Sequence, residues 1–403
     1  MKFNKKHIIG FVCLCLVFGA CVDTYKIDIV TDRGYVLVDG TITDLNEPQF
    51  VQIVRTPDDA QYTSTEFTST IVARTKTAFP VSNANVKLIV NRKESIPLQE
   101  VDAGYYYLPA SFKAKVGDTY QLWFQTINNG KIYESSIETM LPVAPITRIY
   151  DEFNKTGVKK YGGGNERISS NDVYIDFDEI PNMKNFYRWR WVLWETQKYC
   201  ETCKQARYNL YETENGETGD CYRDLTLPGN NEYDYICGSL CWDIFYSSEI
   251  NIFSDIYTDG QPQKNKLVAQ IPLYQSNQCL VSIQQMSLTP NAYRYFKLIQ
   301  DQSVNTGTLA DTPPAPIKSN VINVKDSKEL VLGYFSVSSV SEKRYMITRK
   351  TAEGGRLNGL FTTITNRLPQ PEDPSGDRGD IPLAICKRSL TRTPLRPAGW
   401  EIK

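Results

Sequence analysis

Cysteines are the residues whose number and spacing offer this chain the most chemistry. The chain of 403 residues has ten cysteines, and five of them fall between residues 200 and 241. This segment is polar and rich in turn-forming residues, so it cannot bury enough apolar surface to order itself. Cross-links that shrink its unfolded ensemble would each contribute on the order of 2–4 kcal/mol. We therefore predict disulfides, for which the candidates are Cys200, Cys203, Cys221, Cys237, Cys241 and Cys279.

The sequence does not choose among the pairings that these six cysteines allow. A bond between the pairs Cys200/Cys203 and Cys237/Cys241 is favoured over one that closes a short gap, because bridges over very short loops are strained. Seven cysteines follow residue 21, so at least one stays unpaired, and we expect that one to be Cys386.

Three other uses of these cysteines compete with disulfides. The four residues of the two pairs could be zinc ligands, but 33 residues separate the pairs, which exceeds the usual spacing of about 15–20 residues. A redox-active Cys-x-x-Cys motif normally lies at a helix N-terminus after a strand, and here a turn-rich segment follows. Free thiols would need a reducing compartment. We predict no metal, no cofactor and no catalytic cysteine.

The scarcity of histidine excludes several kinds of catalysis. The only histidine is His7, which lies in a segment that we expect to be cleaved. The mature chain would then have no imidazole for a Ser-His-Asp or Cys-His site, for a general base or for a metal site. We therefore expect no catalytic residues. Carboxylate pairs for glycoside hydrolysis stay open, because 46 acidic residues allow many such pairs.

An aromatic row in residues 186–196 offers a binding surface. Tyr187, Trp189 and Trp191 share one face of a predicted strand, with Arg188 and Arg190 on the other. The three rings could stack on sugars or on a peptide, so they are our binding candidates. The structural alternative, which we favour, is a core strand whose arginines reach out to solvent.

Acidic and glycine-rich motifs give weaker signals. Three aspartates on one strand face, with a glutamate beside them, could hold Ca²⁺ through their oxygens, but the spacing matches no known loop, so we favour a solvated face. Three glycines at 162–164 lack the helix and Lys-Ser/Thr of a phosphate-binding loop. The tripeptide 378–380 is an integrin-type motif that we attribute to chance. The acidic residues are Asp172, Asp176, Asp178 and Glu179.

The amino terminus has the features of a secretory signal. Three lysines in residues 1–7 precede a 13-residue apolar run at 8–20, which as a helix would rise only about 20 Å and is too short to span a bilayer. Gly19, Ala20 and Cys21 resemble a lipoprotein cleavage site, with Cys21 acylated and residues 21–33 forming a tether. An ordinary signal with an incidental cysteine is the alternative. Acylation with more than one chain gives stable anchoring.

The charge balance argues against nucleic acid as a partner. The chain has 45 basic and 46 acidic residues, and removal of residues 1–20 deletes three of the lysines. A surface that tracks phosphates needs an excess of basic residues. A mildly acidic mature surface also has no reason to adhere to anionic lipids, so the lipid anchor must hold the protein at the membrane.

Residues 34–145 are predicted to form an immunoglobulin-like β-sandwich. Its strand candidates alternate with period two, as in the first, where Val36, Val38 and Ile42 face one way. Asn128-Asn129-Gly130 predicts a hairpin turn. The strand candidates are residues 35–43, 50–55, 84–90, 105–108, 119–126 and 131–139.

Residues 146–403 are predicted to form a larger β-rich domain that contains the cysteines and one or two helices, so the chain as a whole is mainly β. A proline-containing linker at 141–146 precedes it. A helix is predicted to begin at Thr289-Pro290, because Thr is a good N-cap and Pro suits the first turn. Residues 329–340 and 343–348 look like a closing hairpin. The other strand candidates are residues 172–178, 186–196, 267–274 and 280–286.

Short motifs follow one another in a set order along nearly the whole chain. They are VDGTIT at 38–43, VSNANV at 81–86, GYY at 104–106, GDTY at 117–120, YRYF at 293–296, PIKSN at 316–320 and LGYF at 332–335. With Cys21 and the cysteine-rich middle, this order resembles a family of Bacteroidetes outer-membrane lipoproteins (domain of unknown function forty-two forty-nine). The resemblance implies a β-sandwich followed by a disulfide-rich domain, and a lipid anchor in the outer membrane, often beside a TonB-dependent transporter. It supplies no catalytic residues.

We therefore expect a lipoprotein anchored in the outer membrane, on the cell surface or on the periplasmic face. Its expected role is that of a non-enzymatic accessory or substrate-capturing partner of a TonB-dependent β-barrel. One alternative is a free-standing glycan- or peptide-binding lipoprotein, which requires Trp189, Trp191 or another aromatic row to be exposed in a concave patch. The other is a carboxylate-dependent hydrolase, which needs two acidic side chains about 5–9 Å apart in a cleft.

Overall fold

A computed structural model of the protein describes residues 34–56, 78–159, 167–214, 216–303, 317–353, 359–372 and 381–401. The described part is mainly β, with strands in six sheets and two helices. None of its helices has the length and apolar character needed to cross a membrane. The predicted signal, Cys21 and tether, the glycines at 162–164 and the tripeptide at 378–380 lie outside these residues.

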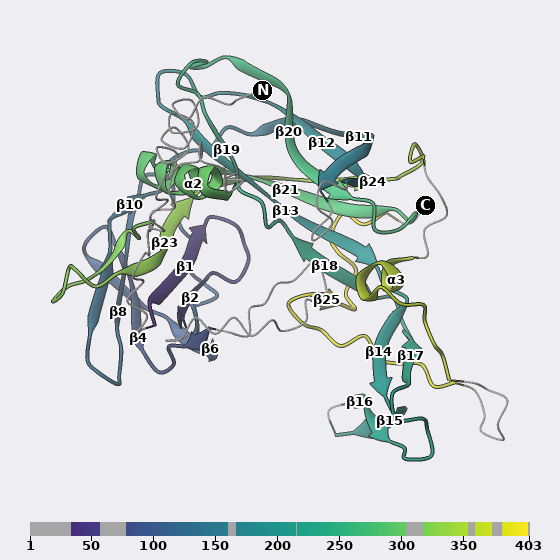
Figure 1. Cartoon of the computed structure of the whole chain (residues 1–403). Helices are drawn as coiled ribbons and strands as arrows, with labels where there is room; N and C mark the ends of the chain where they lie inside the picture. Colours follow the sequence, from purple (N-terminus) through teal and green to yellow (C-terminus); the bar gives the residue numbers. More distant parts are fainter. Residues whose placement is uncertain are drawn as a thin grey trace, which may run out of the picture.

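Two six-stranded sheets face each other across one apolar core and form the amino-terminal sandwich (Figure 1). Alternation of buried and half-buried residues explains its strands. In β8 (Thr119–Gln125), Tyr120, Leu122 and Phe124 point into the core, and the residues between them are half-buried. The first sheet contains β1 (Val36–Thr43), β2 (Phe50–Arg55), β3 (Phe79–Pro80), β6 (Gln99–Asp102), β7 (Tyr105–Tyr107) and β23 (Val331–Ser338). The second contains β4 (Asn85–Val90), β5 (Glu94–Pro97), β8 (Thr119–Gln125), β9 (Ile132–Ser135), β10 (Glu138–Thr139) and β22 (Val321–Asn323).

Two local features that the sequence predicts for the sandwich, a strand face and a turn, are present in the structure. The inward face predicted for β1 is confirmed, because Val36, Val38 and Ile42 are all buried. The predicted turn is confirmed as well: β8 and β9 pair in antiparallel fashion, and Gly130 between them has a positive φ of 62°. The predicted β-sandwich therefore has a structural counterpart in these two facing sheets, while its immunoglobulin-like character stays a prediction.

The sandwich is completed by strands from far along the chain. The strand β23 lies parallel to β1, with Val36 opposite Val331 and Thr43 opposite Ser338, and β22 pairs with β9. The predicted closing hairpin at 329–348 is wrong, because β24 (Val340–Ile347) leaves for another sheet and pairs with β21 (Cys279–Ser287). The predicted boundary at residue 145 accordingly does not separate the sheets. Pairing between distant segments depends on contacts that a local pattern does not encode.

Gly333 sets how closely β23 can approach β1. Its φ is +82°, and a Cβ at this position would lie 2.0 Å from the backbone oxygen of Val38. We expect Gly333→Ala to lower the free energy of unfolding by more than about 3 kcal/mol, since both a strained φ and a backbone clash are introduced. Gly117→Ala is the matched control, because its φ is +90° and a Cβ there would meet nothing within 4 Å. Chemical denaturation checks both variants, and equal losses would refute the role of the clash.

The second body consists of a three-stranded sheet and a six-stranded sheet that share a core. Strand β13 (Phe186–Thr196) matches the predicted residues, and every residue of β21 is buried, including its two serines and two glutamines. The smaller sheet contains β11 (Ile146–Lys159), β12 (Arg167–Asp178) and β20 (Pro262–Pro272). The larger contains β13 (Phe186–Thr196), β18 (Trp242–Tyr246), β19 (Asn251–Ser254), β21 (Cys279–Ser287), β24 and β25 (Arg392–Thr393).

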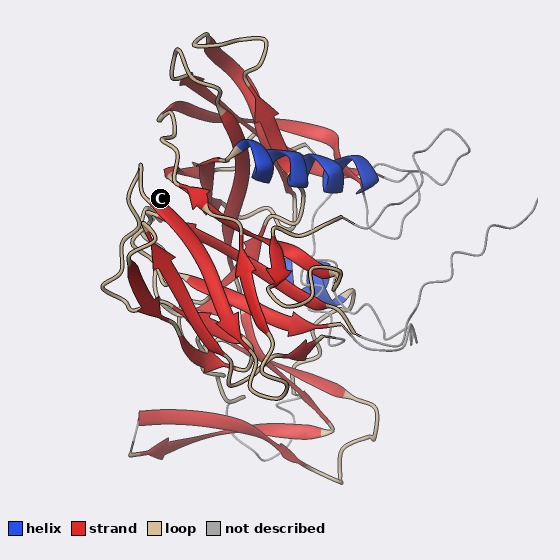
Figure 2. Cartoon of the chain, turned by 90° about the vertical axis from the view of Figure 1, so that its left-hand side faces the viewer, coloured by secondary structure: helices blue, strands red, loops and turns tan. Residues whose placement is uncertain are grey.

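Helix α2 (Pro290–Ser303) lies at the junction of the two bodies (Figure 2). It begins where the sequence predicts, and the hydroxyl of Thr289 accepts a hydrogen bond from the N–H of Ala292. Tyr334 of β23 and Thr289 both donate hydrogen bonds to Glu138, which is buried. The helix thus ties the sandwich to the second body. The other described helix is α3 (Leu360–Thr365), so one or two helices were correctly predicted.

A cysteine-rich arm projects from the end of the larger sheet, at the bottom of both views (Figures 1 and 2). It consists of two ribbons, β14 (Tyr199–Lys204) with β17 (Glu232–Ile236), and β15 (Ala206–Thr213) with β16 (Gly216–Arg223). Residues 381–393, which we call the strap, run back along the arm: Ala384 bridges to Cys237, and Ile385 donates a hydrogen bond to the hydroxyl of Tyr208.

Candidate functional site at the base of the arm

Three disulfides hold the arm and the strap together. Cys200 is bonded to Cys237, Cys203 to Cys221, and Cys241 to Cys386. The first bond joins the two predicted pairs, as expected. Two expectations are corrected: Cys279 is not in a disulfide, and Cys386, expected to be unpaired, closes the strap onto the base of the arm.

The place of each cysteine in the fold explains both corrections. Cys279 is the first residue of β21, whose residues are all buried in the second body, whereas Cys386 lies in the strap, in the cluster that contains the other paired cysteines. The predicted strand at 280–286, directly after Cys279, was the available signal, because a cysteine in a core strand behaves as a small hydrophobic residue. The polar segment 200–241 contains five cysteines, so one from outside it, Cys386 of the strap, completes the pairs.

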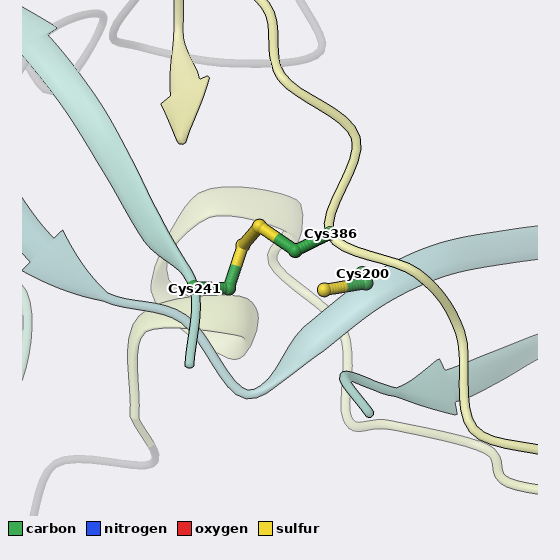
Figure 3. Close-up of side chains that lie close together, drawn as sticks. All are labelled: Cys200, Cys241 and Cys386. Carbon is green, nitrogen blue, oxygen red and sulfur yellow. A yellow bond between two sulfur atoms is a disulfide. The ribbon is translucent and has the colours of Figure 1, made fainter. Parts of the chain in front are cut away.

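The bonding pattern is incompatible with the zinc site that was considered as an alternative from the sequence. Cys203 is bonded to Cys221 and does not join the other three cysteines of that tetrad. The sulfurs that do gather belong to Cys200, Cys241 and Cys386, all within 4.8 Å of one another and all buried (Figure 3). Metal binding needs thiolates, and here every one of these sulfurs is part of a disulfide.

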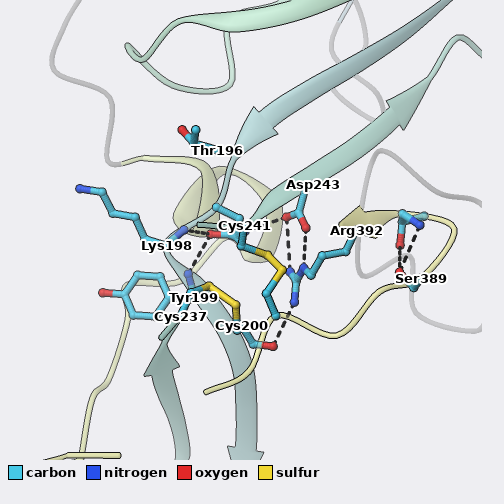
Figure 4. Close-up of polar contacts among 12 residues, drawn as sticks. Thr196, Lys198, Tyr199, Cys200, Cys237, Cys241, Asp243, Ser389 and Arg392 are labelled. Carbon is cyan, nitrogen blue, oxygen red and sulfur yellow. Dashed lines mark hydrogen bonds and ion pairs between the residues drawn. A yellow bond between two sulfur atoms is a disulfide. The ribbon is translucent and has the colours of Figure 1, made fainter. Parts of the chain in front are cut away.

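Polar contacts fix the base of the arm to the larger sheet. Asp243 of β18 accepts a hydrogen bond from Gln197 at 2.7 Å and one from the guanidinium of Arg392 at 2.7 Å. Arg392 also donates to the carbonyl of Cys200 at 3.0 Å (Figure 4). One arginine of the strap therefore bridges the sheet and the first disulfide of the arm.

A second arginine ties residues 367–370 to the arm. Arg367 donates to both oxygens of Asp234, at 2.6 and 2.5 Å, and the hydroxyl of Thr202 donates to the same carboxylate. Asp234 is fully buried, and the partly exposed Arg367 has a raised pKa because it donates hydrogen bonds to Asp234. A buried carboxylate needs such compensation, so this pair positions the arm and is not free to act on a substrate.

A buried ion pair lies directly behind the base. Arg349 and Glu195 both have fully buried side chains, and the two guanidinium nitrogens Nη1 and Nη2 donate to the two carboxylate oxygens at 3.0 and 2.5 Å. Arg349 also donates to the carbonyls of Gln275 and Asn277. The pair thereby holds the loop between β20 and β21 in place. Although burial opposes it, the Glu195 carboxylate raises the pKa of Arg349.

The free thiol belongs to the same network. Cys279 is fully buried, and burial together with the neighbouring Glu195 raises the pKa of its thiol well above the usual range. A thiol in such surroundings is inert, because only the thiolate reacts as a nucleophile.

Thiol counting tests this assignment. In a version of the chain that begins at Val22, we expect no thiol to react with Ellman's reagent in the native state and one to react after unfolding in guanidinium. Cys279→Ala should abolish the reaction of the unfolded chain. A thiol that reacts in the native protein would contradict the three disulfides or the burial of Cys279.

A shallow cavity of about 300 Å³ opens at the base of the arm, at the lower end of the usual size range of ligand pockets. Its lining combines the start of the arm, the loop between β20 and β21, and α3. The side-chain amides of Gln197 and Gln275 are already hydrogen-bonded to other residues of the chain. The rings of Tyr199 and Phe361 contact each other, with their centroids 4.6 Å apart. The cavity is lined by Thr196, Gln197, Lys198, Tyr199, Gln275, Ser276, Asn277, Gly359, Leu360, Phe361 and Pro369.

No acidic residue lines this cavity or the second one, of about 360 Å³, beside Arg55 and Phe79 of the sandwich. A hydrolase of the kind considered from the sequence would need two carboxylates in a cleft. Neither of these two cavities in the described part of the chain provides them.

The aromatic binding candidates lie in the core. Tyr187 and Trp189 are each 1% exposed, and the indole N–H of Trp189 donates to Gln285 at 2.9 Å. Trp191 is half-buried and packs against the same core. These rings therefore do not form an exposed platform. The expectation that the arginines reach solvent is corrected for Arg188, whose guanidinium lies 4.2 Å from the ring of Phe296 in α2 and whose pKa burial lowers to about 10.

The acidic row is largely buried and already paired. Asp172 accepts hydrogen bonds from Ser170, Asn154 and Gln270, and Asp176 accepts one from the backbone of Asn265. The favoured expectation of a solvated face is wrong for Asp172, Asp176 and Glu179. Among the described residues these carboxylates do not form a metal-ligand cluster.

Comparison with known proteins places the chain in a family. Residues 22–344 match the model of a domain of unknown function (DUF4249). The match includes the sandwich, the arm and β23, and it ends within β24. No curated protein and no solved structure gives a significant match. Because the matched region covers most of the 403 residues, the chain belongs to the DUF4249 family.

Proposed function

We propose that the protein is a lipoprotein anchored in the outer membrane that binds a partner through its cysteine-rich arm and catalyses no reaction. The observation that carries this proposal is the arm itself, which projects from the body and is held by three disulfides (Figure 1). Disulfides of this kind belong to exported proteins. The predicted signal and Cys21 supply the route and the anchor.

The surface of the arm is suited to contact with another protein. Leu225 is 75% exposed, Leu240 62% and Tyr222 50%. Their apolar surface gains nothing from the fold of this chain, and covering it on a partner would contribute about 25 cal/mol per Å². A rigid element also loses little conformational freedom on binding, and the disulfides provide that rigidity.

The proposed partner is a TonB-dependent β-barrel, as the family resemblance implies. The anchor and the arm belong to different bodies: the chain enters the sandwich at β1, and the arm extends from β13 and β18 of the larger sheet. An anchored sandwich therefore leaves the arm available to a neighbour in the same membrane. The alternative of a glycan-binding platform loses its support, because Tyr187 and Trp189 are buried and Trp191 packs half-buried against the same core.

Photo-crosslinking in intact cells tests the proposal. A photoreactive amino acid at Leu225 or Tyr222 should capture an outer-membrane β-barrel, identified by mass spectrometry after detergent extraction. The matched control is Val101, which is 68% exposed on the sandwich and should give no such product. If the arm positions give no crosslink and the protein purifies alone, the partner role is wrong.

The anchor is tested separately. Cys21→Ala should release the protein from the membrane fraction, and mass spectrometry should find acyl chains on residue 21 of the unchanged chain. Protease treatment of intact cells should cleave the arm if the protein faces outward. An unmodified Cys21 would refute the anchor without bearing on the contact made by the arm.

A further inference from the structure

Two of the three disulfides lie side by side at the base of the arm. The sulfur of Cys200, which is bonded to Cys237, is within 4.8 Å of both sulfurs of the Cys241–Cys386 bond (Figure 3). The third disulfide, Cys203–Cys221, is not part of this group. A thiolate formed at Cys200 would therefore have a second disulfide within reach.

The residues of this group differ in their exposure to solvent. Cys200, Cys241 and Cys386 are at most 6% exposed. Cys237 is half-buried, and its neighbours Ile236 and Gly238 are exposed. A thiol in solution can thus approach Cys237, whereas the Cys241–Cys386 bond is shielded from direct attack.

We propose that Cys237 is a thiol-modification site, and that its modification is passed on to the buried Cys241–Cys386 bond. An external thiolate attacks the sulfur of Cys237, a new bond forms between these two sulfurs, and the Cys237–Cys200 bond breaks with its electron pair on Cys200. The Cys200 thiolate then attacks the Cys241–Cys386 bond and forms a disulfide with one of these residues. The other leaves as a thiolate and takes up a proton.

These two exchange steps need no oxidant, since one external thiolate is consumed and one thiol is formed on the protein. The class of reactant is a small thiol or the reactive cysteine of a dithiol oxidoreductase, both of which exchange with disulfides through mixed disulfides. The guanidinium of Arg392 lies at the carbonyl of Cys200, 3.0 Å away (Figure 4).

The rearrangement would change how the strap is held. In the native pairing Cys386 ties the strap to Cys241, at the start of β18. After transfer, Cys386 is bonded either to Cys200 of the arm or to no cysteine. Modification at an accessible sulfur would thereby alter a buried connection between the arm and the body.

Mapping of trapped products tests the proposal. The full-length protein is treated in its native state with limiting glutathione, quenched with acid, unfolded, alkylated with N-ethylmaleimide and digested for mass spectrometry. We expect most molecules with glutathione on Cys237 to carry maleimide on Cys241 or Cys386, and a new disulfide that contains Cys200. Cys279 should be alkylated in every sample, because it is a free thiol that unfolding exposes.

Two variants serve as controls. With Cys241→Ala and Cys386→Ala combined, the maleimide should move to Cys200, because the acceptor bond is gone. With Cys203→Ala and Cys221→Ala combined, transfer from Cys237 should continue unchanged. If the chain without substitutions carries glutathione on Cys237 and maleimide on Cys200, no transfer occurs and the proposal is wrong. It is equally wrong if Cys237 takes up no glutathione.

Discussion

Replacement of Arg349 by methionine should lower the free energy of unfolding by about 3–5 kcal/mol, because it leaves the buried carboxylate of Glu195 without its partner. The guanidinium also donates to the carbonyls of Gln275 and Asn277, so the loop between β20 and β21 loses its anchor as well. Chemical denaturation followed by tryptophan fluorescence measures the loss. The matched control is Lys155→Met, which removes a largely exposed ion pair with Glu353 and should change stability by less than about 1 kcal/mol.

A double variant separates the ion pair from the shape of the site. Arg349→Met combined with Glu195→Leu should recover much of the loss, since a buried ion pair replaced by apolar residues of similar volume is often neutral. If the double variant were as unstable as Arg349→Met alone, the unpaired carboxylate would not be the cause. A loss below about 1 kcal/mol in the single variant would contradict the burial of the pair.

The stability of Arg349→Met should also depend on pH in a particular direction. Burial raises the pKa of Glu195, and removal of Arg349 takes away the charge that opposes this shift. A carboxyl whose pKa is higher in the folded than in the unfolded state favours folding at low pH, and this contribution is lost as the pH rises through the folded-state pKa. The deficit of the variant against the unchanged protein should therefore be smaller at pH 5 than at pH 8.

Local features of the fold could be predicted from the sequence, and distant pairings could not. The alternation in β1, the run that forms β13 and the Thr289 cap of α2 all depend on neighbours in the chain, and each was predicted at or near its observed position. The parallel pairing of β23 with β1 joins residues about 300 apart, and no turn or periodic pattern specifies it. A chain that changes sheets at Ser339 looks like a hairpin when only local signals are used.

The candidate site shows the same division. The polar, cysteine-rich segment 200–241 predicted a cross-linked element, and it forms the arm. The choice between Cys279 and Cys386 required knowledge of which segment lies in the core of the second body and which lies beside the arm. The aromatic row at 187–191 shows the limit of composition, because rings suited to stacking on a ligand are equally suited to a core. Burial of Tyr187 and Trp189 decides between these uses.

The Cys241–Cys386 disulfide should be the most stabilising of the three, because it closes the longest loop. It spans 145 residues, compared with 37 for Cys200–Cys237 and 18 for Cys203–Cys221. The loop-closure entropy removed from the unfolded chain grows with loop length, so loss of the longest bridge should cost about 4–5 kcal/mol and loss of the shortest about 3 kcal/mol. Both cysteines of a pair are changed to alanine, so that no new thiol lies beside Cys200.

The variant Cys241→Ala/Cys386→Ala should also release the strap from the arm. Without the disulfide, the contacts left to residues 384–387 include the bridge of Ala384 to Cys237 and the hydrogen bonds of Ile385 to Tyr208 and of Lys387 to Gly219. Net contributions of about 1 kcal/mol for each hydrogen bond are too small to keep such a segment protected. Limited proteolysis and hydrogen exchange should therefore find the strap open in Cys241→Ala/Cys386→Ala and closed in Cys203→Ala/Cys221→Ala. Equal protection in the two variants would show that the strap is held by packing alone, and a larger loss of stability in the second would refute the ranking by loop length.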